Sequence, residues 1–133
     1  TVVRKAQARY VAQFVAHVNP YRGFSYRDDP DIIAFEIFNE PWHDLSPPDE
    51  TTRYINTLVA SMRGTGLRKP IFYNISEHFT PAHGRAVCAA NVQGVTGQWY
   101  PTGLVRGATL PGNPLPNVDR YTIPWDAFPE CRN

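Results

Sequence analysis

Apolar side chains recur at the spacing of a helix in two segments of the chain. The first predicts a helix over Val3–Val18, ended by Pro20, with a buried stripe of Val3, Tyr10, Phe14 and Val18, flanked by Val11 and Val15. The second follows Ser46, which precedes the acidic Asp49 by three residues and is expected to cap a helix that has proline at its first position. The stripe of that helix consists of Tyr54, Ile55, Leu58, Val59 and Met62, and its end is expected at Gly64 and Gly66.

Three shorter apolar runs predict strands. Ile32–Phe38 is too short for a helix and too continuous for a strand with one wet face, which indicates a buried parallel strand. Pro70–Ile75 and Val92–Thr96 are expected to be strands as well, and Thr80-Pro81 to begin a short helix that reaches Ala90. Strands therefore alternate with helices, as in a parallel sheet covered by helices.

Length, composition and charge narrow the class of protein. The chain has 133 residues, of which 42% are hydrophobic and 19% charged, with a net charge of +1. No apolar run approaches the roughly 18 residues that a membrane span needs, which predicts a soluble globular protein without a membrane partner. No cluster of Lys and Arg offers a surface for nucleic acid. Cys88 and Cys131 lack the spacing of a metal site or a disulfide framework, so we expect each to be an independent thiol.

Chemically useful side chains follow the first predicted strand. Asn39, Glu40, Trp42 and His43 stand just past its carboxyl end, where parallel α/β folds place their working residues. Glycoside hydrolysis needs a carboxylic acid that protonates the leaving oxygen and a second carboxyl group that attacks or activates water. Asn39 can donate a hydrogen bond to a sugar hydroxyl, and Trp42 and Trp99 offer flat apolar faces for sugar rings.

One segment carries a specific resemblance. From Tyr26 to Pro41 the chain has a tyrosine, Asp29-Pro30, an apolar strand with an internal glutamate, and then Asn39-Glu40-Pro41. This segment resembles the fourth-strand signature of glycoside hydrolase family 5 and its clan, and most of all the β-mannanase-like members. Gln98-Trp99-Tyr100-Pro101 is similar to the sixth-strand His-x-Tyr-Pro element of that clan, with Gln98 in place of the usual histidine.

The resemblance implies a fold and a mechanism. The fold is α/β, a partial (β/α)8 TIM barrel in which residues 1–133 form part of one catalytic barrel and the parent chain supplies the remainder. A complete barrel needs about 250 residues, so three strands cannot close one. The implied reaction is retaining hydrolysis of β-linked glycans such as mannan or glucan, with Glu40 as general acid/base and Asn39 as its substrate-positioning partner. It requires no metal or cofactor.

The same resemblance places the nucleophile at the end of the seventh strand, beyond Asn133. Glu130 has no strand pattern before it and is rejected for that role. We therefore expect this piece alone to be inactive. By family analogy, the whole protein is expected to be secreted or periplasmic.

Several other residues have a functional and a structural interpretation. Glu77 and His78 follow the second strand, and they are candidates for substrate contact or for an ordinary surface loop; Trp99, Tyr100 and His43 are further subsite candidates. Glu36 lies inside an apolar strand and is expected to meet an arginine or a hydrogen-bond network, in support of the site. His17 and His83 fall on helical segments and are expected to be solvated.

Two motif matches are set aside. Glu40 and His43 have the Glu-x-x-His spacing of metal ligands, but that motif requires a helix, and Pro41 after a strand argues against one. Asn74-Ile75-Ser76 matches the N-glycosylation acceptor but falls in a strand that is predicted to be buried.

Two alternatives from other functional classes remain open. The first is a carbohydrate-binding pseudoenzyme that has kept the groove and lost one carboxylate. The second is an α/β interaction domain unrelated to sugars.

Overall fold

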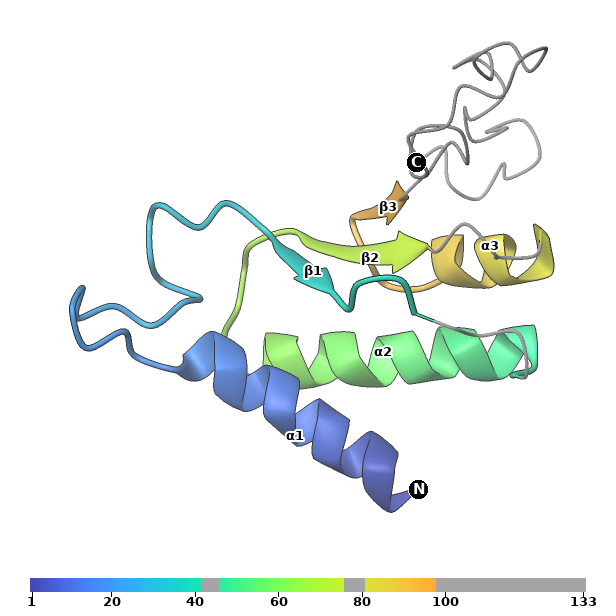
Figure 1. Cartoon of the computed structure of the whole chain (residues 1–133), viewed down its shortest axis with the longest axis horizontal. Coiled ribbons are helices and arrows are strands. Elements are labelled where there is room, and N and C mark those ends of the chain that lie inside the picture. The colour runs from blue at the N-terminus through green and yellow to red at the C-terminus, as the bar shows by residue number, and fades with distance from the viewer. Residues whose placement is uncertain (42–45, 76–80, 98–133) are drawn as a thin grey trace, which may run out of the picture.

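The chain folds as helices that alternate with parallel strands. The structure, a computed structural model, describes residues 1–41, 46–75 and 81–97. The elements of this described part are, in order, α1 (Val2–Ala16), β1 (Phe35–Ile37), α2 (Pro48–Gly64), β2 (Ile71–Ile75), α3 (Pro81–Cys88) and β3 (Gly94–Gly97) (Figure 1). Both neighbouring strand pairs are parallel, and the sheet order is β1-β2-β3. The predicted α/β class is confirmed, and the arrangement is consistent with part of a TIM barrel.

The core lies between the sheet and the helices α1 and α2, which lie together on one side of β1 and β2 (Figure 1). The α2 stripe was predicted correctly in this respect, because Ile55, Leu58, Val59 and Met62 are all buried. They pack with the buried side chains of the strands, which are Phe35, Ile37, Ile71, Tyr73 and Ile75. Of the helices in the described ranges, none has the length and apolar character that a bilayer span requires.

The predicted stripe of α1 is wrong in part. Ala8 and Val15 are the buried residues of this helix, whereas the exposed residues include Val3, Tyr10, Phe14 and Val18. The reason is that α1 lies on α2 through its Ala8 and Val15 side, which leaves the larger apolar residues on the other side. Two of these contact other rings, since Phe14 lies 5.1 Å from Tyr26 and 6.3 Å from Tyr10 between ring centroids.

The start of α2 differs from the prediction by one residue. Pro47 occupies the N-cap position, and no side chain caps the helix, so the predicted capping role of Ser46 is wrong. The Ser46 carbonyl oxygen instead lies 2.9 Å from Nε2 of His83. His83 is 7% exposed, which contradicts its predicted solvation, while His17 is exposed as expected.

The first strand is shorter than its apolar run. Only Phe35–Ile37 pair with β2, in register with Ile71–Tyr73, and Ile33 is 84% exposed. Phe35 and Ile37 are buried but Glu36 between them is exposed, so the prediction of a strand buried on both faces is wrong for the described structure. The face that carries Glu36 lies opposite the helices, because successive side chains of a strand alternate.

Asp29 fixes the chain as it enters β1. Asp29 is 5% exposed. Its Oδ1 lies 3.2 Å from Nη2 of Arg22 and accepts a 3.0 Å hydrogen bond from the Asp31 N–H. The Lys69 ammonium donates to the Asp29 carbonyl oxygen, which joins this turn to the start of β2. A buried carboxylate needs such partners, so the Asp29-Pro30 step has a structural role here.

Cys88, the last residue of α3, is disulfide-bonded, so the prediction of an independent thiol is wrong for this residue. The chain has two cysteines, and the other, Cys131, lies outside the described residues. Sequence spacing could not reveal the bond, because a disulfide depends on the distance between two residues in space.

Candidate active site

Asn39 and Glu40 lie just beyond the carboxyl end of β1, as predicted, and both are exposed. This is the edge of a parallel sheet at which α/β proteins bind ligands. The other proposed site residues lie outside the described part of the chain; they are Trp42, His43, Glu77, His78, Trp99 and Tyr100. The site is therefore built here from the residues at the ends of β1 and β2.

The backbone around Asn39 has an unusual conformation. Phe38 has a φ of 56° and Glu40 a φ of 46°, so left-handed residues stand on both sides of Asn39. For a residue other than glycine this region costs about 1 to 3 kcal/mol, and such residues cluster at functional sites. The surrounding structure must hold this turn in place, and contacts are found at both residues.

Phe38 is held by α2. Its ring stacks on that of Tyr54, with centroids 6.3 Å apart and planes 10° apart. The Tyr54 hydroxyl donates a 3.0 Å hydrogen bond to Oε1 of Gln7 on α1. The residue that begins the turn is thus connected to both helices beneath the sheet.

Glu40 is held by β2. Its main-chain N–H donates a 2.8 Å hydrogen bond to Oδ1 of Asn74, which is 2% exposed. Nδ2 of Asn74 in turn donates to Oγ1 of Thr96 on β3 at 3.2 Å, and the Thr96 hydroxyl donates to Oε2 of Glu36 on β1. All three strands therefore contribute to one hydrogen-bonded chain that ends at Glu40.

Strand register explains why these side chains meet. Asn74 pairs with Thr96, and Glu36 lies in register with Phe72, two residues before Asn74. In-register residues of parallel strands project from the same face, as do residues two apart on one strand. Glu36 was expected to meet an arginine or a hydrogen-bond network, and the network is what the structure shows.

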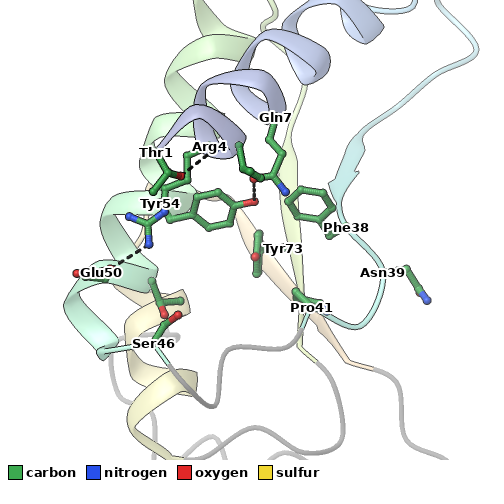
Figure 2. A pocket seen from close by; sticks show the side chains of 12 residues that line it. Thr1, Arg4, Gln7, Phe38, Asn39, Pro41, Ser46, Glu50, Tyr54 and Tyr73 are labelled. Atoms are coloured by element: carbon green, nitrogen blue, oxygen red, sulfur yellow. Dashed lines mark hydrogen bonds and ion pairs between the residues drawn. The ribbon is translucent and has the colours of Figure 1, made fainter.

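A cavity of about 420 Å³ lies on the helix side of the turn. It is lined by residues of α1 and α2 together with Phe38, Pro41 and Tyr73, and an ion pair of 2.9 Å joins Arg4 to Glu50 at its wall (Figure 2). Asn39 also lines this cavity. Burial raises the pKa of Tyr73 and that of Tyr54, while the nearby Arg4 acts to lower the pKa of Tyr54.

Asn74 and Thr96 are the site residues that sequence reasoning missed. Asn74 was considered only as a glycosylation acceptor, and its rejection in that role is supported, because its amide is buried and hydrogen-bonded at both ends. No sequence signal identified them, because their meeting depends on the register of the strands. Within the described ranges, no group of three or more His, Cys, Asp or Glu side chains is arranged to hold a metal ion.

Comparison with known proteins finds plant mannanases. Mannan endo-1,4-beta-mannosidase 2 of Oryza sativa subsp. japonica is 22% identical to this chain over 121 residues, which cover 87% of the chain and 26% of the rice protein. Mannan endo-1,4-beta-mannosidase 3 of the same organism is 38% identical over 47 residues, 35% of the chain and 10% of the relative. A third rice protein, named as mannan endo-1,4-beta-mannosidase 5, is 43% identical over 42 residues, which cover 32% of the chain and 9% of that protein.

The similarity covers only a small part of each relative. The chain spans between 9% and 26% of the length of these relatives. No family model matches the chain, and no solved structure matches it. The chain is thus similar to segments of glycoside hydrolases, and the parallel α/β arrangement described above agrees with that similarity.

Proposed function

We propose that this chain is part of the catalytic barrel of a retaining glycoside hydrolase that acts on β-linked glycans of the mannan type. The observation that carries the proposal is the placement of Glu40. It is an exposed carboxyl group at the end of a parallel strand, in a left-handed turn whose main chain is bonded to the next strand. The names of the rice relatives support the substrate class.

Glu40 is assigned the role of general acid/base. In the first step it donates a proton to the glycosidic oxygen as that bond breaks, and in the second it takes a proton from the water that attacks the glycosyl-enzyme. Asn39, its exposed neighbour, is assigned to a sugar hydroxyl next to the reacting carbon. The aromatic residues Trp42, Trp99 and Tyr100 are proposed to contact the sugar rings.

The second carboxylate is proposed to come from another part of the whole protein. A retaining mechanism needs that group about 5 to 5.5 Å from the acid/base. We also propose a secreted or periplasmic location. The disulfide at Cys88 supports this, since disulfides persist mainly in oxidising compartments.

The proposal is tested on the whole protein that contains this chain. Incubation with β-1,4-mannohexaose should release shorter oligosaccharides, and ¹H NMR during the first minutes should show the new reducing end in the β configuration. First-formed α product would disprove retention. Binding of the hexaose without cleavage would indicate a carbohydrate-binding pseudoenzyme, and neither binding nor cleavage would favour an interaction domain.

A further inference from the structure

We propose that Asn74 is a positioning residue that holds the acid/base Glu40, and that Thr96 and Glu36 fix the orientation of its amide. This inference rests on the proposed function, because it assigns a role to Asn74 through Glu40. It depends on the hydrogen-bonded chain Glu36–Thr96–Asn74–Glu40, in which every member except Glu40 contributes its side chain.

The direction of the chain follows from the chemistry of its far end. An ionised carboxylate can only accept hydrogen bonds, so the Thr96 hydroxyl must give its proton to Glu36. The Thr96 oxygen is then available as an acceptor, and it receives the Asn74 amide NH₂. The carbonyl oxygen of the same amide is thereby turned toward the Glu40 N–H, which needs an acceptor.

The opposite orientation of the amide would fail at both ends, because its carbonyl oxygen would also face the Thr96 oxygen, whose proton is given to Glu36. A flipped Asn74 would place its NH₂ group against the Glu40 N–H, where two donors would face each other. Because Asn74 is 2% exposed, water has little access to relieve that mismatch. Glu36 on β1 therefore acts on Glu40, just beyond the same strand, through the side chains of Thr96 on β3 and Asn74 on β2.

This arrangement matters because Glu40 is otherwise in an unfavourable conformation. Its φ of 46° needs external support, and the bond to Asn74 supplies that support at the main-chain atom next to the catalytic side chain. A carboxyl group that has to meet a glycosidic oxygen tolerates little misplacement, and displacement by about 1 Å can cost on the order of 100-fold in rate.

The test uses Thr96→Val, which removes the hydroxyl and keeps the side-chain shape, with Thr96→Ser as the conservative control that retains the hydroxyl. Both are made in the whole protein and assayed for kcat/KM on β-1,4-mannohexaose and on 2,4-dinitrophenyl β-mannobioside. This parameter reports the first step for each substrate, and only the hexaose needs protonation of its leaving group. Thermal unfolding establishes that each variant is folded.

Thr96→Val is expected to lower kcat/KM about tenfold on mannohexaose and less than twofold on the dinitrophenyl substrate. Thr96→Ser should recover most of the loss, and Asn74→Ala should lose at least as much as Thr96→Val if it folds. In a Glu40→Ala background, Thr96→Val should cause no additional loss on mannohexaose, because the group that it positions is gone.

The inference fails if Thr96→Val leaves kcat/KM unchanged, or if it lowers kcat/KM equally on both substrates. It also fails if Thr96→Val lowers kcat/KM a further tenfold in the Glu40→Ala background. Any of these would make the network structural. The proposed function fails separately: if Glu40→Ala alone slows both substrates equally, Glu40 is not the acid/base, whatever Thr96→Val does.

Discussion

The ring of Phe38, two residues before Glu40, stacks on the ring of Tyr54 with planes 10° apart. The turn at the end of β1 is therefore held from below by α2, through Phe38, and from the side by β2, through Asn74. Contacts at both ends of the turn provide the preorganisation that the proposed catalytic role of Glu40 requires.

Removing the parts of Tyr54 should have graded effects. Tyr54→Phe keeps the stacking on Phe38 and loses the hydroxyl that donates to Gln7, which should cost about 0.5 to 1.5 kcal/mol of unfolding free energy. Tyr54→Ala should cost about 1 to 3 kcal/mol more, since the stacked ring is also lost. Urea unfolding measures both, with Tyr21→Phe, at a residue that is 96% exposed, as the control. Equal losses for the two Tyr54 variants would contradict a stabilising stack.

Glu40→Ala in the whole protein should separate the two steps of the reaction. On a dinitrophenyl glycoside the first step should be almost unaffected, and the glycosyl-enzyme should accumulate because the general base is missing. Azide needs no base and should restore turnover with a β-glycosyl azide as product. On natural glycans the loss should reach roughly 10²- to 10⁴-fold. Absence of azide rescue, together with equal losses on both substrates, would indicate a nucleophile or a structural residue.

Two adjacent threonines on α2 should respond in opposite ways to valine. The Thr51 hydroxyl is buried and has no hydrogen-bond partner in the described structure, so Thr51→Val should be neutral or stabilise by up to about 1 kcal/mol. The Thr52 hydroxyl donates a 2.8 Å hydrogen bond to the Ala86 carbonyl oxygen on α3, so Thr52→Val should destabilise by about 1 kcal/mol. Urea unfolding curves of the two variants measure these changes in unfolding free energy. A larger loss of unfolding free energy for Thr51→Val than for Thr52→Val would show that the Thr51 hydroxyl is hydrogen-bonded.

Gly94 on β3 leaves little room for a side chain beside the ring of Phe72. A Cβ atom there would lie 2.5 Å from Cε1 of Phe72, its register partner on β2, so Gly94→Ala should destabilise by about 1 to 3 kcal/mol. Adding Phe72→Leu should recover part of this loss. Gly64→Ala is the control, because a Cβ at Gly64 meets nothing within 4 Å. A loss at Gly94 that persists unchanged in the double variant would locate the strain in the backbone.

Cys88 should resist alkylation. Because it is disulfide-bonded, N-ethylmaleimide in denaturant should leave Cys88 unlabelled until a reductant is added, as peptide mass spectrometry can show. Reduction should lower the unfolding free energy by about 2 to 4 kcal/mol. Labelling of Cys88 before reduction would show that the thiol is free in the protein.

The sequence predicted the positions of the helices and strands, because the spacing of apolar residues largely determines them. Apolar patterns located five of the six described elements, the Thr80-Pro81 pair located α3, and Asn39 and Glu40 lie at the strand end as predicted. Boundaries were less predictable. Ile32 and Ile33 have strand-forming side chains, but pairing is limited to the residues opposite Ile71–Tyr73. Propensity alone cannot say how far a neighbouring strand extends.

The support for Glu40 could not be read from the sequence because it depends on register. Glu36, Asn74 and Thr96 come from three strands, and a shift of one residue in any pairing would turn a side chain to the other face. Four of the five residues of β2 are buried, so no alternation distinguishes Asn74 from its neighbours. Its polar contacts become visible only when the strands are aligned.

The contacts of Asp29 suggest how this segment would diverge among related proteins. Asp29 is bound to Arg22, Asp31 and Lys69 ahead of the strand, whereas Glu40 stands exposed behind it. In a related protein without the proposed hydrolytic activity, the contacts of Asp29 would still hold the chain ahead of β1, whereas the carboxyl group of Glu40 would no longer be needed for catalysis. Retention of Asp29 would therefore mark a shared local structure, and retention of Glu40 would be the better marker of the proposed chemistry.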